Sequence, residues 1–183
     1  MRGEETREKI MEAALKVIYN ETIEGLSTRK VSGVANVNLA AIHYHHRSKD
    51  GMLIDLSRYV LNNYVTPEVF EGLEASKESV EVIETLLKRV FALYKKRPDA
   101  IVTAIYLWLQ GLRSRRIKDI FKSFRSDKLL QLEEVLAASM SKRRARRVAE
   151  RALTYISGWL LETVVEEVIP DQAMIEEAAR LLV

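Results

Sequence analysis

The chain has 183 residues, 48% of them hydrophobic, which suits one compact unit, or a small module on a larger one, with a real hydrophobic core. Its net charge is only +3, so any affinity for nucleic acid must come from local clustering of charge. Cysteine is absent, which excludes disulfides, thiol catalysis and zinc sites with cysteine ligands.

The first predicted helix begins near residues 4–6 and has one buried stripe. Its apolar residues recur at positions i, i+3, i+4, i+7 and i+8, and they are Ile10, Ala13, Ala14, Val17 and Ile18. This spacing is typical of an amphipathic helix with one face in a core. We expect the helix to cover the elements that follow.

Residues 27–46 predict two short helices joined by a tight turn, with the apolar spacing of a helix-turn-helix. Ser27 or Thr28 caps the first helix. Asn36 occupies the turn, where the backbone needs a positive φ that asparagine tolerates best after glycine. Asn38 then caps the second helix.

The charges around this motif have one sign. No acidic residue occurs between Glu24 and Asp50, and the basic residues and histidines there are Arg29, Lys30, His43, His45, His46, Arg47 and Lys49. A metal site is not predicted, because cysteine is absent and no nearby carboxylate has ligand spacing. The pattern indicates an anionic partner, with His46 packed beneath the second helix.

At these residues the chain resembles the TetR family of repressors, over residues 6–56. The matching segments are T-R-E-K-I-M-E-A-A-L, S-T-R-K-V-S and A-I-H-Y-H-H-R-S-K-D-G-M-L. The departures are Asn36 for a turn glycine, His43 for an aromatic residue, His46 for phenylalanine, and Gly33 with Val34 for a polar pair. The resemblance implies an N-terminal DNA-binding domain, a C-terminal ligand-binding domain, and a small-molecule effector.

The rest of the chain predicts further helices and no strand. A helix over residues 48–65 joins the two domains and ends at Pro67, and residues 68–79 form a loop or short helix. Apolar stripes then predict five further helices. The first includes residues 83–94 and ends at Pro98, and the second covers 100–109 at the centre of the second domain. The third covers 117–136 with a bend or break at Ser126, the fourth includes 145–163 and ends at Pro170, and the last covers 173–183.

We expect the second helix of the helix-turn-helix to be the recognition helix, and the position of each residue relative to this helix indicates which part of the DNA it would contact. Those expected near base edges are Asn38, Leu39, Ala40, Ala41 and His43. Those expected near phosphates are Thr28, Tyr44, His45 and Lys49, with Arg29 beside them. The partner would be double-stranded DNA with a palindromic operator, because two-fold symmetry doubles the contacts of one recognition helix.

A homodimer needs an interface away from the DNA. Helices over 127–140 and 142–169 are the candidates, since Ala145, Ala149, Ala152 and Gly158 allow close packing. Ile156→Arg is predicted to give a monomer. Aromatic residues at helical spacing more often form core, but the resemblance makes Phe91, Tyr94, Tyr106, Trp108 and Trp159 candidates to line an effector pocket.

The sequence thus predicts an all-α, two-domain protein, with a helix-turn-helix domain over residues 4–65 and a ligand-binding and dimerisation domain over 66–183. We expect a dimeric cytoplasmic repressor that a small, largely apolar effector releases from DNA. A helical binding or scaffold protein without a transcriptional role is the alternative. No catalytic motif, signal peptide, membrane span or cofactor site is found in the sequence, and an enzyme is not predicted.

Overall fold

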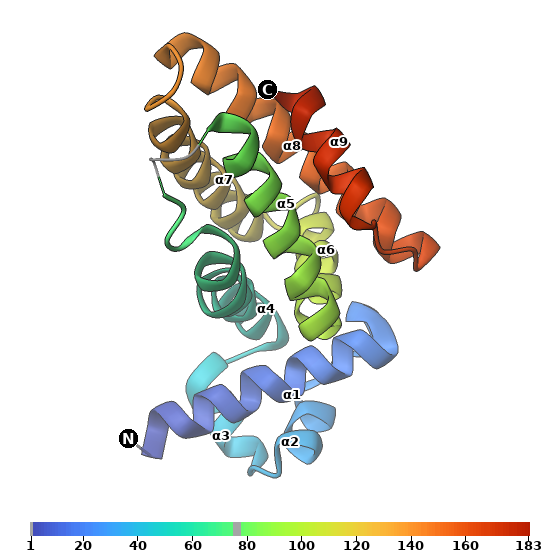
Figure 1. Ribbon diagram of the computed structural model, residues 1–183. Helices are drawn as coiled ribbons and strands as arrows, with labels where there is room; N and C mark the ends of the chain where they lie inside the picture. Colours follow the sequence, from blue (N-terminus) through green and yellow to red (C-terminus); the bar gives the residue numbers. More distant parts are fainter. Residues whose placement is uncertain (1, 75–77) are drawn as a thin grey trace. The chain divides into compact units, whose positions relative to one another are not determined.

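The computed structural model describes residues 2–74 and 78–183, and all regular secondary structure in these ranges is helical (Figure 1). The predicted all-α fold class is confirmed. The helices are α1 Arg2–Gly25, α2 Thr28–Ala35, α3 Leu39–His46, α4 Lys49–Val60, the π-helix η1 Leu61–Phe70, α5 Ser79–Lys96, α6 Pro98–Gln110, α7 Arg115–Leu136, α8 Lys142–Glu166 and α9 Gln172–Leu182. No helix of the described ranges is long and apolar enough to cross a bilayer.

Packing divides the chain into two compact units, which are Met1–Asn63 with Arg97–Phe121, and Tyr64–Lys96 with Lys122–Val183. The first boundary lies close to the predicted one at residue 65. The grouping of α6 differs from the prediction, because this helix packs against α1 and α4 rather than at the centre of the second unit. The chain therefore crosses between the units after residues 63, 96 and 121, and not only along the helix before Pro67.

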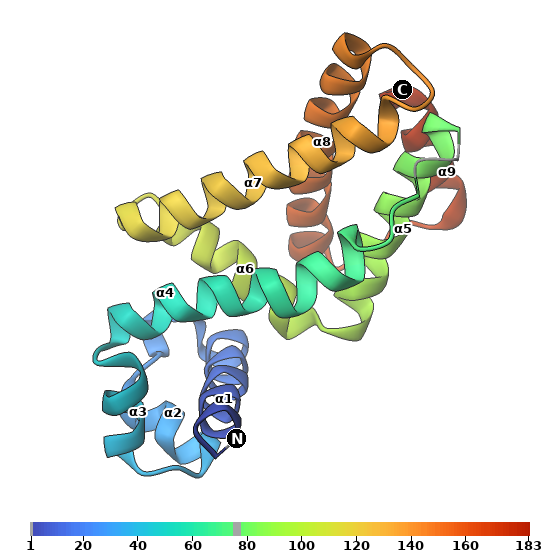
Figure 2. The same cartoon turned by 90° about the vertical axis from the view of Figure 1, so that its left-hand side faces the viewer.

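In the first unit, α2 and α3 lie against α1 (Figure 2). The five apolar residues of the predicted α1 stripe are all buried. Across from them, Val31 of α2 and Ile42 of α3 are fully buried. Burial of side chains from three short or amphipathic helices in one core holds the two short helices in place, since neither is long enough to be stable alone.

The helix that begins at Lys49 does not end before Pro67, as the sequence predicted. It continues as η1 through Pro67 to Phe70, and the Glu71 N–H donates to the Thr66 carbonyl at 3.0 Å. In an α-helix the proline ring would collide with the carbonyl four residues earlier. The wider π turn moves that carbonyl aside, which accounts for the continuation. Residues 75–77 of the predicted loop lie outside the described ranges.

In the second unit, α5 packs against α9 and α8. The predicted stripe is buried at Ile83, Leu86, Leu87, Val90 and Phe91. Helix α5 ends at Lys96, as predicted from Pro98, and this proline is the first residue of α6, a position that suits its fixed φ and missing N–H. The predicted break at Ser126 is wrong, because α7 runs unbroken through this exposed serine, whose cost to a helix is small when neighbouring turns are well packed.

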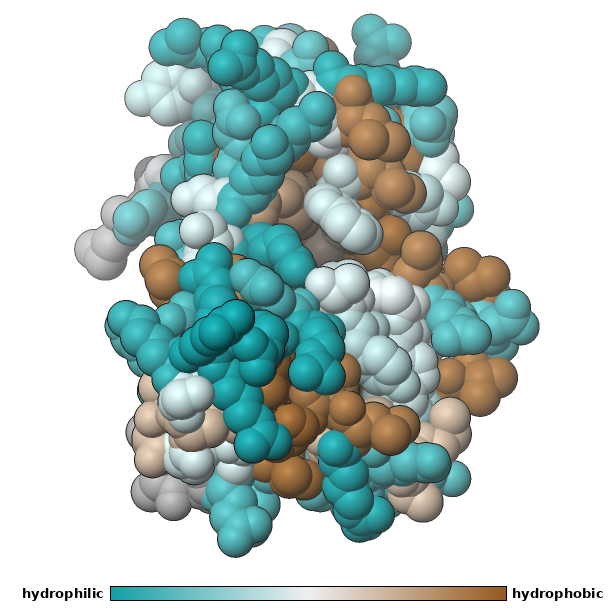
Figure 3. Space-filling view, turned by 90° about the horizontal axis from the view of Figure 1, so that it is seen from above, coloured by the Kyte–Doolittle hydropathy of each residue, from teal (hydrophilic) through white to brown (hydrophobic). Residues whose placement is uncertain are grey.

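Helix α8 has two different faces. Ala145, Ala149, Ala152 and Ile156 are buried within the chain itself. Ile156 is therefore not an interface residue that the single chain leaves free, and Ile156→Arg, predicted to give a monomer, would place a charge in the protein's own core. The opposite face exposes apolar side chains, including Leu161 and Val165. Hydrophobic side chains also reach the surface between hydrophilic ones in the space-filling view (Figure 3).

Candidate nucleic-acid interface

Capping residues fix the turn between α2 and α3. The Ser27 hydroxyl accepts a hydrogen bond from the Lys30 N–H at 3.2 Å. Asn36 has φ 51° and ψ 47°, the left-handed conformation, and its N–H donates to the Gly33 carbonyl at 3.2 Å. The Asn38 carboxamide oxygen accepts from the Ala40 N–H at 2.9 Å. The predicted turn and the predicted cap of the second helix are confirmed.

Helix α3 has one inner and one outer face. Ile42 and His46 point inward and are buried, whereas Ala40, His43 and Tyr44 are exposed at i, i+3 and i+4. Tyr44 is 84% exposed, the most of any large hydrophobic residue among those described. Because Ala40, His43 and Tyr44 are not used in the core of the first unit, this face of α3 is the candidate contact surface.

A buried hydrogen bond supports α3 from below. The Asp55 carboxylate of α4 accepts from His46 Nδ1 at 2.8 Å, and the imidazole is 3% exposed. Burial lowers the pKa of His46, and the bond to Asp55, which raises it, offsets this only in part. Packing of His46 under the recognition helix, predicted from the sequence, is confirmed.

The residues after α3 join it tightly to α4. The Ser48 hydroxyl accepts from the Gly51 N–H at 3.1 Å, which confirms the predicted cap. A Cβ at Gly51 would lie 2.1 Å from the His46 carbonyl oxygen, so only glycine fits there. The Lys49 ammonium donates to the Ile23 carbonyl of α1 at 2.9 Å. Lys49 therefore already has a structural partner.

Two cationic side chains differ from what the sequence indicated. Lys30 forms an ion pair with Glu21 of α1, which removes it from the set that could face an anion. Arg47 is exposed, with φ 60°, directly after α3 and one turn beyond the exposed His43 and Tyr44. Sequence reasoning counted Arg47 as basic but did not assign it to the site. Its spacing from Tyr44 was the available signal.

Of the remaining predicted DNA-binding residues, Arg29 and Asn38 are exposed, while Thr28, Leu39, Ala41 and His45 are half-buried. The Asn38 side chain is engaged in capping, as described above. The His45 ring packs edge-on against Tyr44, with centroids 5.1 Å apart. The structure thus brings the predicted residues together on and around α3, and leaves the outer side of the helix to Ala40, His43 and Tyr44.

The five aromatic residues proposed for the effector fall into different parts of the fold. In the second unit, Phe91 is buried and packs edge-on against Trp159, with centroids 4.9 Å apart, and Tyr94 is half-buried on α5. Tyr106 and Trp108 belong to the first unit, where Trp108 is half-exposed. Trp159 also lines an open groove of about 510 Å³ between α8 and α9.

The capped α2–α3 pair packs against α1, and all regular secondary structure of the described residues is helical. These features define a helix-turn-helix protein with the fold of the TetR family. No family model matches the chain. A TetR transcription regulator from Haloarcula marismortui is 18% identical, with a TM-score of 0.81, and the match covers 98% of this chain and 96% of that one. A transcriptional regulator from Rhodococcus sp. Rha1 gives a TM-score of 0.83 at 18% identity, over 96% and 92% of the two chains.

Sequence similarity leads to the same class. The nicotine-responsive transcriptional repressor HdnoR of Paenarthrobacter nicotinovorans is 24% identical over 165 residues, which cover 85% of this chain and 82% of that protein. The resemblance to the TetR family stated from residues 6–56 is confirmed, and it extends over nearly the whole chain. The proteins that the chain resembles are transcription regulators rather than enzymes.

Proposed function

We propose that this protein is a sequence-specific, DNA-binding transcriptional repressor whose helix α3 enters the major groove. The observation that carries the proposal is the outer face of α3, where Ala40, His43 and Tyr44 are exposed inside a stretch without acidic residues. A short helix presented by a rigid turn is the geometry that reads base edges. The name of the relative HdnoR, a repressor, supports the regulatory role.

Within this proposal the residues divide by the chemistry of their contacts. Asn38, Leu39, Ala40, Ala41 and His43, at the N-terminal end of α3, contact base edges. Thr28, Arg29, Tyr44, His45 and Lys49 contact phosphates, and we add Arg47 to this group. Phosphate contacts fix the register of the protein on the duplex, whereas base contacts select the sequence.

DNA selection tests this function. Purified protein incubated with a pool of random duplexes is expected to enrich one palindromic sequence, and a footprint on that sequence should show two protected half-sites. The half-sites should lie about 34 Å apart or a multiple of this, since both recognition helices must meet the same side of the duplex. Enrichment of no sequence would favour the alternative, a helical binding or scaffold protein.

The proposed repressor is a homodimer that pairs through the exposed face of α8. Gly158 is open, with no atom within 4 Å of an added Cβ, and Tyr155 beside it is exposed. Basic residues precede Gly158 on this face and acidic residues follow it, for example Arg151 and Glu162. A two-fold axis midway between Tyr155 and Gly158 would place Arg151 of each copy opposite Glu162 of the other, a self-complementary arrangement.

Charge reversal tests the dimer. Arg151→Glu and Glu162→Arg should each shift the protein toward monomer in sedimentation velocity, and an equal mixture of the two variants should recover a dimer, because both heterodimer pairs are then of opposite charge. Arg143→Glu, the same charge change on an exposed residue near the start of α8, is the control and should remain dimeric. A mixture that stayed monomeric would rule out this pairing.

The effector is proposed to be a small, largely apolar molecule that binds the second unit and releases the DNA. The packed pair Phe91 and Trp159, with Tyr94 of the same unit as a further candidate, would report its binding, whereas Tyr106 and Trp108 lie in the first unit and are not proposed with them. The relative HdnoR is named as nicotine-responsive. Hydrophobic compounds are screened against tryptophan fluorescence, and a hit is titrated with and without operator. Equal affinity in both titrations would exclude release, because coupling must be reciprocal.

A further inference from the structure

The chain leaves the first unit after Asn63 and enters it again at Arg97. Tyr59 lies one helical turn before the first of these two crossings, and the Asn63 carboxamide donates to the Tyr59 carbonyl at 3.0 Å. Arg97 is itself the first residue after the second crossing. Each crossing is therefore flanked, on the side of the first unit, by a polar side chain of known position.

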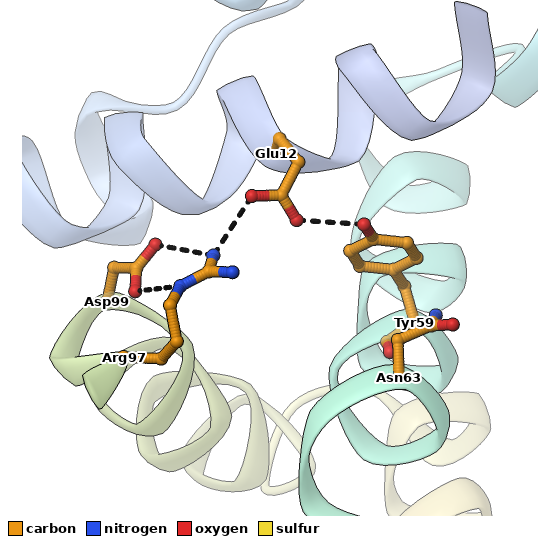
Figure 4. A network of polar contacts seen from close by, with 5 residues as sticks. All are labelled: Glu12, Tyr59, Asn63, Arg97 and Asp99. Carbon is orange, nitrogen blue, oxygen red and sulfur yellow. Dashed lines mark hydrogen bonds and ion pairs between the residues drawn. The ribbon is translucent and has the colours of Figure 1, made fainter. Parts of the chain in front are cut away.

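Both of these side chains bind the same carboxylate (Figure 4). The Tyr59 hydroxyl donates to Oε1 of Glu12 at 2.8 Å, and Arg97 Nη2 donates to Oε2 of Glu12 at 2.9 Å. Glu12 belongs to α1, whose buried stripe packs on α2 and α3. One residue of the helix that supports the DNA-binding pair is thus bonded, through separate oxygen atoms, to side chains beside two of the three chain crossings.

The Arg97 side chain is held in place by Asp99 of α6. Its Nε and Nη2 atoms donate to the two Asp99 carboxylate oxygens at 2.9 Å and 2.8 Å. Burial raises the pKa of Asp99. The hydrogen bond and the positive charge of Arg97 lower this pKa, and with the backbone hydrogen bonds they outweigh burial, so the pKa is depressed overall. A guanidinium bound at both carboxylate oxygens has a fixed orientation. Movement of the first turn of α6 therefore moves the guanidinium that is bound to Glu12.

We propose that Glu12 is the positioning residue through which the second unit and the DNA-binding helices influence each other. The Arg97 bond transmits movement of the α5–α6 junction, and the Tyr59 bond transmits movement of the α4–η1 helix. The inference deepens the proposed repressor function and rests on it. The carboxylate has two discrete bonds that a ligand in the second unit can weaken or strengthen, as a coupling element requires.

The two bonds can be removed separately. Arg97→Met removes the bond from Arg97 and leaves the Tyr59 bond to Glu12 in place. Tyr59→Phe removes only the hydroxyl bond, and Glu12→Leu removes both bonds. Glu8→Leu, the same change at an exposed position one turn earlier on the same helix, is the control for Glu12→Leu. Hydrogen exchange of each full-length protein is measured with and without the selected operator duplex.

In the unchanged protein and in Glu8→Leu, operator binding is expected to alter amide exchange in residues 64–70 and 91–96. Arg97→Met should lose the change in 91–96 and keep that in 64–70, Tyr59→Phe should show the opposite, and Glu12→Leu should lose both changes. A role in stability alone would raise exchange everywhere without this regional split. Unaltered responses in all three variants, or no response in the unchanged protein, would overturn the proposal.

A second measurement needs no DNA. Leu86 is fully buried in the second unit, so Leu86→Ala should loosen that unit and raise amide exchange in α2 and α3. With Glu12→Leu also present, which removes both bonds, the rise in α2 and α3 should be lost. An undiminished rise would overturn the coupling role even if operator binding is confirmed. Failure to enrich an operator, by contrast, would count against the proposed function alone.

Discussion

The Nδ1 atom of His46 and the Oδ2 atom of Asp55 lie 2.8 Å apart beneath the recognition helix. This bond joins the last residue of α3 to the middle of α4. The other ring nitrogen, Nε2, is buried and has no hydrogen-bond partner among the described residues. The imidazole is therefore held neutral, since a second N–H at this position would be buried without an acceptor.

Stability is predicted to depend on pH through His46. Its pKa is below 6.5 in the folded chain, so as pH falls below about 6.5 the unfolded chain binds a proton that the folded chain does not. The free energy of unfolding should decrease over this window until pH reaches the folded-state pKa. Urea unfolding between pH 8 and pH 5 measures the effect.

His46→Phe should flatten this part of the pH profile, because no imidazole then titrates under α3. His43→Phe is the matched control, since His43 is an exposed histidine of the same helix, and it should leave the slope as it is. A profile for His46→Phe that keeps the full slope would assign the pH dependence to other groups.

Asn36 should respond oppositely to glycine and to alanine. Its φ of 51° costs an alanine about 1 kcal/mol relative to asparagine, whereas glycine is free of this penalty. Asn36→Ala should therefore lower the unfolding free energy by about 1 kcal/mol, and Asn36→Gly should leave it unchanged or raise it. Asn20→Ala, at an exposed position of α1 before the kink at Thr22, is the control and should be neutral or stabilising. Equal costs for the two Asn36 variants would contradict the prediction.

The helix-turn-helix could be predicted from sequence because its signals are local. Ser27, Asn36, Asn38 and Ser48 each act on backbone groups within four residues, and all four do what their positions predicted. Such short-range hydrogen bonds depend little on the rest of the fold. The requirement for Gly51 was missed, since it follows from a close approach to the His46 carbonyl that only the three-dimensional turn creates.

The chain after the helix-turn-helix shows what local sequence patterns do not determine. Pro67 usually ends a helix, but a π turn accommodates it, and no local pattern distinguishes these outcomes. Ile156 lies on an apolar stripe, but periodicity cannot tell whether the stripe faces the protein's own core or a second copy. The partners of α6 likewise depend on packing between segments far apart in the chain, so aromatic spacing could not group Tyr106 with the first unit.

Tyr44 is predicted to contribute to DNA affinity without selecting sequence. Its hydroxyl is proposed to donate to a phosphate, a charge-assisted bond of about 1.5–3 kcal/mol. Tyr44→Phe should weaken operator and non-specific duplexes by the same factor, with an unchanged salt dependence because no charge is lost. The measurement is fluorescence anisotropy on both duplexes. Tyr19→Phe, exposed on α1, should have no effect. A loss confined to the operator would instead assign Tyr44 to base contacts.

Lys49 is the residue for which two roles compete, and salt dependence separates them. Its ammonium donates to the Ile23 carbonyl, and it is also proposed to face a phosphate. If both hold, Lys49→Ala should lower the unfolding free energy by about 1 kcal/mol, weaken specific and non-specific DNA alike, and reduce the slope of log affinity against log salt by about one. Lys16→Ala, exposed on α1, is the control for the loss of one charge. A loss of stability with the slope unchanged would leave Lys49 as a support for the end of α1, and the phosphate contact would have to come from Arg47 or Arg29.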